Sequence, residues 1–142
     1  MNNLETSQKA IDRAFRWYQG AIRAYEDERW DDSIYTFQMS VEQSLKGILI
    51  LYGIEYPKKH DISNVYILLK EKDVPEWFKN KINSQIKILK NLIKLKGISA
   101  YGYIDGITKE HFKDDAIKFK KPVEDIITTC KALIVEFSRN IS

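Results

Sequence analysis

The chain is poor in residues that crosslink a fold or interrupt helices. Its 142 residues include 6 Gly, 3 Pro and 1 Cys. The single cysteine, Cys130, excludes an internal disulfide and is typical of a protein from a reducing cytosol. No apolar run reaches the roughly 18 residues of a membrane-spanning helix. The N-terminal residues 1–5 lack the basic start and apolar stretch of a secretion signal. We therefore expect a cytoplasmic protein without a membrane segment.

The charges nearly balance and the apolar content is that of a folded protein. Lys and Arg number 23 against 20 Asp and Glu, a net charge of +3, and 44% of the residues are hydrophobic. Such a small net charge does not by itself indicate nucleic-acid binding. The aromatic content of 12% argues against disorder. The length suits one domain of about 100–200 residues, so residues 1–142 are expected to form a single domain.

Apolar periodicity predicts four long helices, because residues spaced i, i+3, i+4 and i+7 lie on one face of a helix. The first stripe includes Ile11 to Tyr25, the second Ile34 to Tyr52, the third Phe78 to Ile93 and the last Ala116 to Phe137. A shorter helix carries Ile62 to Leu69, and no segment alternates as a strand does. The sequence therefore predicts an all-α, up-and-down bundle of four long helices and one short helix.

Local signals predict where these helices start and stop. Asp31 or Asp32 is expected to cap the second helix, and residues 73–76 resemble a start signal for the fourth. The helical pattern fails from Gly97 to about Lys113, and Pro122 should kink the last helix or open its second half. Within the second helix, Gly47 is unfavourable unless a neighbouring helix approaches closely there, and Gly53 is a plausible left-handed stop.

Two charged patterns are candidates for function. Glu42 and Lys46 are spaced as a helical ion pair, which as a solvated surface pair contributes only about 0.3–0.5 kcal/mol. Between Trp77 and Ile104 there are six lysines and no acidic residue: Lys79, Lys81, Lys87, Lys90, Lys94 and Lys96. Four of them (79, 87, 90 and 94) fall within an arc of about 80° on a helix. Such a lysine ridge attracts phosphates, unless acids on an adjacent helix neutralise it or it only keeps the surface soluble.

Motifs for metal or cofactor chemistry are missing. His60 and His111 lie in predicted loops, each near one carboxylate, and are interpreted as ordering the helices that follow. Cys130 occupies a core-facing position, as a buried apolar group does. The glycines of residues 97–106 fit no known phosphate-binding spacing. We expect neither a metal nor a cofactor.

A set of short motifs lies in order along residues 10–138: Trp17 with Ala21 and Ala24, Trp30, Ser33, Phe37-Gln38, Glu42-x-x-Leu45-Lys46, Tyr52-Gly53, His60-Asp61-Ile62, Ala100-Tyr101-Gly102-Tyr103, Phe112 and Asp115-Ala116. In its order and spacing this set resembles the HEPN (higher eukaryotes and prokaryotes nucleotide-binding) domain. The resemblance implies a bundle of about five helices that commonly forms a homodimer.

Many members of that family are encoded beside a minimal nucleotidyltransferase, as toxin with antitoxin or as an accessory subunit. Others are metal-independent endoribonucleases, in which an Arg and a His four to six residues later lie at the dimer cleft. The supporting E-x-x-x-K element of the family matches Glu42 and Lys46. Here Lys96 takes the position of the Arg, Tyr101 stands five residues further on, and His111 lies outside the motif.

Lysine holds phosphate as a point charge, without the bidentate contact of arginine, and tyrosine is a poor base at neutral pH. We therefore expect a non-catalytic HEPN-type dimer that binds a nucleotide or RNA phosphate, paired with a minimal nucleotidyltransferase. The expected ligand-binding residues are Glu42, Lys46, Lys90, Lys94, Lys96, Tyr101 and Tyr103. One alternative is an endoribonuclease that uses Lys96 with Tyr101 or His111. The other is an oligomerisation scaffold with exposed aromatic residues such as Trp30 and Tyr103.

Overall fold

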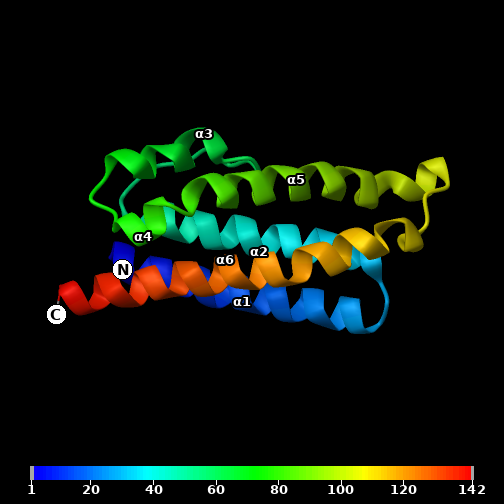
Figure 1. Ribbon diagram of the computed structural model, residues 1–142, viewed down its shortest axis with the longest axis horizontal. Helices are drawn as coiled ribbons and strands as arrows, with labels where there is room; N and C mark the ends of the chain where they lie inside the picture. The colour runs from blue at the N-terminus through cyan, green and yellow to red at the C-terminus, as the bar shows by residue number, and fades with distance from the viewer. Residues whose placement is uncertain (1, 142) are drawn as a thin grey trace.

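The computed structural model describes residues 2–141, and every regular element in them is a helix (Figure 1). The four long helices are α1 (Asn3–Glu26), α2 (Trp30–Leu51), α5 (Ile82–Tyr101) and α6 (Lys113–Asn140). They run in alternating directions, so the chain begins and ends at the same end of the molecule (Figure 1). This confirms the predicted all-α bundle. No helix within residues 2–141 is long and apolar enough to cross a membrane.

Short elements connect the long helices. Between α2 and α5 lie α3 (Ser63–Tyr66), the 3-10 turn η1 (Ile67–Glu71) and α4 (Glu76–Lys79). Between α5 and α6 lie two further 3-10 turns, η2 (Gly102–Asp105) and η3 (Lys109–Phe112). In Figure 1 the α3 segment lies along the outer side of α5. The chain between α2 and α3 therefore passes close to α5.

Helix α2 is the centre of the bundle and packs against α1, α5 and α6. Its glycine allows the closest helix contact: the Ser7 hydroxyl donates to the Gly47 carbonyl at 2.9 Å. A Cβ atom on Gly47 would lie 3.3 Å from Ala10 Cβ. The predicted close approach at Gly47 is confirmed. The predicted left-handed end of this helix at Gly53 is confirmed as well, because Gly53 follows α2 closely with a φ of +68°.

Two predicted helix caps are wrong. Helix α2 starts at Trp30 with Arg29 at the N-cap and no side-chain cap bond, so Asp31 and Asp32 lie inside the first turn. Trp30 itself is buried, only 5% exposed, so the expectation of an exposed Trp30 on an oligomerisation surface is wrong. The two carboxylates still lie favourably at the positive end of the helix dipole. Similarly, α4 starts after Pro75 without a side-chain cap. The predicted fourth helix is thus split into α4 and α5.

Two predictions near the C-terminal half need correction. Gly97 lies inside α5, which continues to Tyr101, so the helix does not fail at Gly97. A glycine without close neighbours lowers helix stability but does not end a helix. The true break is at Gly102, where a Cβ would lie 3.0 Å from Ile107 Cβ. Of the two effects predicted for Pro122, the opening of a second helix is wrong, because this residue lies inside the single helix α6. The kink stays a prediction.

The helix contact at Gly47 gives a stability prediction. Gly47→Val places two methyl groups against the backbone-fixed Ala10 Cβ and should lower the free energy of unfolding by about 2 kcal/mol or more. As the control, the added Cβ of Gly20→Ala in α1 meets nothing within 4 Å. This change should raise the free energy of unfolding by up to about 1 kcal/mol. Urea unfolding followed by circular dichroism measures both. A Gly47→Val variant as stable as the parent would contradict the close packing.

Candidate functional site

A buried carboxylate lies at the centre of the site. The Glu42 side chain is only 4% exposed, and His60 Nδ1 lies 2.8 Å and Lys46 Nζ 3.5 Å from its Oε1. A buried ionised carboxylate is strongly destabilising unless it is paired and hydrogen-bonded. The interpretation of Glu42 and Lys46 as a solvated surface pair is therefore wrong. Instead, Lys46 lies one helical turn after Glu42 on α2 and is one of the two partners of this buried charge.

The second partner comes from the loop that follows α2. Asp61 accepts hydrogen bonds from the backbone N–H and the hydroxyl of Ser63, which fixes the start of α3. Burial alone raises the pKa of Asp61, but the bonds from Ser63 and the charge of Lys90 outweigh it and lower the pKa below its ordinary value. Asp61 thus orders the start of α3, as predicted. His60 instead turns towards Glu42.

Helix α5 contributes a partly desolvated lysine. Lys96 Nζ lies 4.5 Å from the centre of the Tyr35 ring of α2, a cation–π distance. Within residues 2–141 its one hydrogen bond goes to Met39 Sδ, at 3.6 Å, and sulfur is a weak acceptor. Burial lowers the pKa of Lys96, and the negative charge of Glu42 offsets this only in part. The ammonium group is therefore held close to the protein without a strong acceptor.

Three of these side chains, Tyr35, His60 and Lys96, meet in one cavity of about 380 Å³. Its lining residues are Tyr35, His60, Ile93, Lys96, Gly97, Ala100 and Tyr101. Ligand sites for small molecules have volumes of about 300–1,000 Å³, so the cavity is large enough for one nucleotide unit. The small residues Gly97 and Ala100 leave this space open.

The predicted site residues fall into two groups. Lys96 and Tyr101 line the cavity, and Glu42 with Lys46 lies directly behind His60. Lys90, Lys94, Tyr103 and His111 are exposed and do not line it. Lys90 acts electrostatically on Asp61. The His111 ring packs against Phe112, with 5.1 Å between ring centres.

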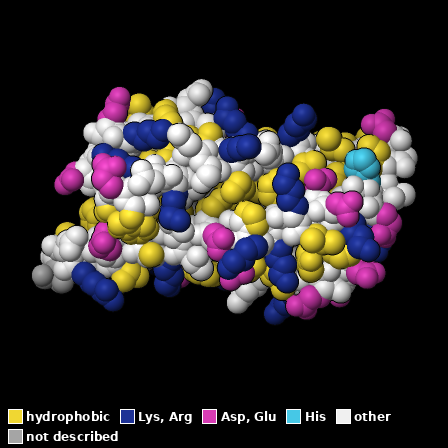
Figure 2. Space-filling view, viewed as in Figure 1, with side chains coloured by type: hydrophobic (Ala, Val, Ile, Leu, Met, Phe, Trp, Pro, Cys, Tyr) yellow, Lys and Arg dark blue, Asp and Glu magenta, His cyan; other side chains and the backbone are white. Residues whose placement is uncertain are grey.

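Lys79 lies on α4, so the predicted lysine ridge on one helix is wrong at this residue, and only Lys87, Lys90 and Lys94 of the four share α5. The ridge on α5 shares a face with the tyrosine of the cavity. At 100° per residue, Lys90, Lys94 and Tyr101 fall within an arc of about 40° on α5. No lysine of α5 forms an ion pair with any residue of the range 2–141. Figure 2 shows Lys and Arg side chains along α5 with few acidic groups among them. The lysines of α5 therefore place positive charge beside the cavity.

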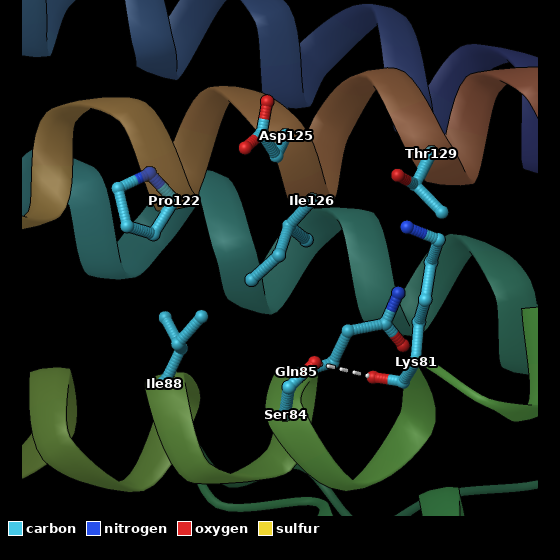
Figure 3. A pocket seen from close by; sticks show the side chains of 8 residues that line it. All are labelled: Lys81, Ser84, Gln85, Ile88, Pro122, Asp125, Ile126 and Thr129. Atoms are coloured by element: carbon cyan, nitrogen blue, oxygen red, sulfur yellow. Dashed lines mark hydrogen bonds between the residues drawn. The ribbon is translucent and has the colours of Figure 1, made fainter.

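A second depression, of about 240 Å³, lies between α5 and α6 and holds none of the predicted ligand-binding residues (Figure 3). Gln85 points into it, and its Oε1 accepts a hydrogen bond from the buried Tyr66 hydroxyl at 2.6 Å. Lys81 and Asp125 both line the depression, so it has no excess of positive charge. Within residues 2–141 no group of three or more His, Cys, Asp or Glu side chains is placed to hold a metal ion. The cavity beside Lys96 is the better candidate.

The sequence reasoning missed His60 and Tyr35 as site residues. Both lie against residues that it did identify, His60 against Glu42 and Tyr35 against Lys96. A signal for His60 was available: the His60-Asp61-Ile62 segment belongs to the motif set of the resembled family, and Glu42 on a core-facing helix needs a partner of opposite charge.

Comparison with known proteins identifies the family of the chain. The HEPN domain family matches residues 7–133. The chain belongs to the HEPN family. It is also 25% identical over 140 residues to the protein named "Putative toxin MJ1304" from Methanocaldococcus jannaschii, in an alignment that covers 94% of this chain and 91% of that protein. No solved structure matches the chain.

The environment of Lys96 in this HEPN domain gives a titration prediction. Because burial disfavours the ammonium form, Lys96 should lose its proton below 10.5, the ordinary lysine value. Glu42→Gln removes the negative charge that favours the ammonium and should lower the pKa of Lys96 further. Carbon-13 NMR of labelled lysine side chains, with the Lys96 signal assigned through Lys96→Arg, measures both values. The control Glu76→Gln changes a carboxylate on α4 and should leave the Lys96 titration unchanged, whereas an unshifted Lys96 in the Glu42 variant would contradict the coupling.

Proposed function

We propose that this toxin-like HEPN protein binds a nucleotide or an RNA phosphate in the cavity beside Lys96. The observation that carries the proposal is the partly desolvated Lys96 ammonium. It lines a cavity of nucleotide size, and its only hydrogen-bond acceptor among residues 2–141 is a sulfur atom. A phosphate oxygen is a far stronger acceptor than a thioether sulfur. A bound phosphate therefore gives Lys96 the strong hydrogen-bond acceptor that residues 2–141 do not provide.

The remaining residues suit the other parts of a nucleotide. Tyr35 and Tyr101 place two aromatic rings at the cavity, and bases stack on aromatic side chains with little sequence preference. Lys90 and Lys94 extend the positive charge along α5, where the phosphates of a longer RNA strand would pass. Lys46 compensates the charge of Glu42. The carboxylate therefore does not cancel the attraction between the lysines of α5 and a phosphate.

Dimerisation and a nucleotidyltransferase partner belong to the same proposal. At the tip of the bundle, the last residue of α5, Tyr101, and the η2 residues Tyr103 and Ile104 are 65%, 74% and 69% exposed. Contiguous exposed apolar side chains of this kind are typical of interaction surfaces. A toxin-like protein needs an inhibitor, and the family resemblance makes a minimal nucleotidyltransferase the proposed one. A reading frame for such an enzyme next to the gene would support this pairing.

The ligand proposal is tested by RNA binding. Lys96→Ala should weaken binding of a fluorescent single-stranded RNA about tenfold and reduce the slope of log affinity against log salt by about one. Adding Lys94→Ala should weaken it further. The control Lys87→Ala removes the same charge from α5 outside the cavity and should have a smaller effect. Fluorescence anisotropy measures the affinities, and equal affinities of parent and Lys96→Ala would contradict the site.

The dimer proposal is tested by light scattering. The parent protein should have the mass of a dimer, and Ile104→Glu should give a monomer because it places a charge in the apolar tip. The control Val135→Glu places the same charge at an exposed position of α6 and should leave the dimer intact. A dimer that binds neither nucleotides nor RNA would instead favour the oligomerisation scaffold.

A further inference from the structure

A buried amide nitrogen in the depression between α5 and α6 has no partner. Gln85 is 2% exposed, and its Nε2 makes no hydrogen bond within residues 2–141. Buried amide groups are nearly always hydrogen-bonded, because an unpaired donor loses its bonds to water without a replacement. Figure 3 shows the carboxamide pointing from α5 into the space between the two helices. The nitrogen is therefore placed to donate to an acceptor that comes from outside the chain.

A tyrosine of the core sets the orientation of this amide. The Tyr66 hydroxyl is fully buried and donates to Gln85 Oε1 at 2.6 Å. This hydroxyl makes no other hydrogen bond within residues 2–141, so its proton requires the amide oxygen as acceptor. An amide turned the other way would direct its nitrogen at Tyr66 and leave the phenolic proton unpaired. The nitrogen, which is a donor only, is thus the group that faces the depression.

A cation lies at the same end of the depression. In Figure 3 the Lys81 amine and the Gln85 amide nitrogen both extend towards the side of Thr129. Among the residues that the structure describes, the Lys81 side chain forms no ion pair and no hydrogen bond. Asp125 also lines the depression, but its carboxylate already pairs with Lys121, at 3.1 Å. The positive charge of Lys81 therefore remains available to a ligand.

The other end of the depression is apolar, and the whole space is small. Helices α5 and α6 each pack on α2 and make little direct contact with one another, which leaves about 240 Å³ between them. Ile88, Pro122 and Ile126 lie at the end away from the two nitrogens (Figure 3). Sites for drug-sized ligands have volumes of about 300–1,000 Å³. The depression therefore suits a molecule smaller than a nucleotide, with a polar group at one end and an apolar body.

We infer that this depression binds a small monocarboxylate with a short, branched apolar body. The carboxylate accepts a hydrogen bond from Gln85 Nε2 and pairs with the Lys81 ammonium, while the hydrocarbon part lies against Ile88 and Ile126. A carboxylate suits both donors, because hydrogen bonds to a charged acceptor are about twice as strong as those between neutral groups. A phosphate suits the depression less, since the Asp125 carboxylate repels a second negative charge and the apolar end offers no donor to further oxygens.

The ligand reaches the buried nitrogen past a movable side chain. Nε2 of Gln85 is itself out of contact with water, but Lys81 is exposed and no ion pair or hydrogen bond among the described residues holds its side chain. Rotation of that side chain opens the way to the amide and brings the ammonium onto the carboxylate. The depression shares no lining residue with the cavity beside Lys96. The inference thus goes beyond the proposed function and does not depend on it.

The test titrates the full-length protein with isovalerate, with its neutral analogue isovaleramide, with acetate and with inorganic phosphate. Proton–nitrogen NMR follows the side-chain NH₂ signals of Gln85, assigned through Gln85→Glu, which keeps an acceptor for Tyr66. The variant is Lys81→Ala, at an exposed position where no ion pair or hydrogen bond among the described residues is lost. The matched control is Lys87→Ala, which removes the same charge from an exposed position of α5 outside the depression.

We expect isovalerate to shift the Gln85 NH₂ signals saturably, with a dissociation constant of about 1 mM. Acetate should bind at least about tenfold more weakly because it lacks the apolar body, and isovaleramide should bind about tenfold more weakly because it lacks the charge. Lys81→Ala should weaken isovalerate binding about tenfold, whereas Lys87→Ala should change it by less than about twofold.

Two kinds of result would overturn the site. The first is the absence of a saturable shift of the Gln85 NH₂ signals, or shifts of the same size with inorganic phosphate. The second is an equal affinity of the parent and Lys81→Ala for isovalerate. RNA is absent from these measurements and Lys96 is unchanged in every variant, so failure here leaves the proposed phosphate binding standing, and the anisotropy assay on Lys96→Ala tests that function separately.

Discussion

The buried carboxylate of Glu42 is the constraint on which the rest of the site depends. A charge that is 4% exposed must be matched inside the protein. Helix geometry supplies Lys46 one turn later, and the imidazole supplies the shorter contact, at 2.8 Å. The loop after Gly53 must therefore follow a path that brings His60 to α2. The need of buried Glu42 for a partner thus holds the loop between α2 and α3, which has little regular structure of its own.

The position of Lys96 follows from the central position of α2. Because α2 is apolar around most of its circumference, α1, α5 and α6 all pack against it. Packing of α5 brings the stem and ammonium of Lys96 over Tyr35 and Met39. Lysine side chains often cover apolar groups with their stems while the charged end stays in water. Here the end is partly withdrawn from water too, which distinguishes Lys96 from the exposed lysines of the ridge.

The sequence predicted the long helices well because each must bury an apolar stripe, and a stripe is visible at the 3.6-residue period. It predicted helix ends poorly. Helix α2 already starts at the buried Trp30, so Asp31 and Asp32 lie within its first turn and neither takes the N-cap position. Gly97 looked like a helix end, yet the chain leaves the helix only at Gly102, where contact with Ile107 requires a glycine.

For the site, the sequence supplied the residues that share a helix and missed the one that arrives from a loop. Glu42 with Lys46, and Lys96 with Tyr101, are related by spacings that a helix fixes in advance. His60 reaches Glu42 from 18 positions away along the chain. No periodicity encodes such a loop path. It follows from tertiary packing and from the need of a buried charge for a partner.

Glu42 and His60 differ in how strongly the fold depends on them. Glu42 is buried, so removing its charge disturbs packing and leaves Lys46 without its carboxylate. The His60 ring is largely exposed, and Asp61 with Ser63 anchors its loop independently. A change of the imidazole therefore removes the short contact to Glu42 while Asp61 and Ser63 keep the loop in place.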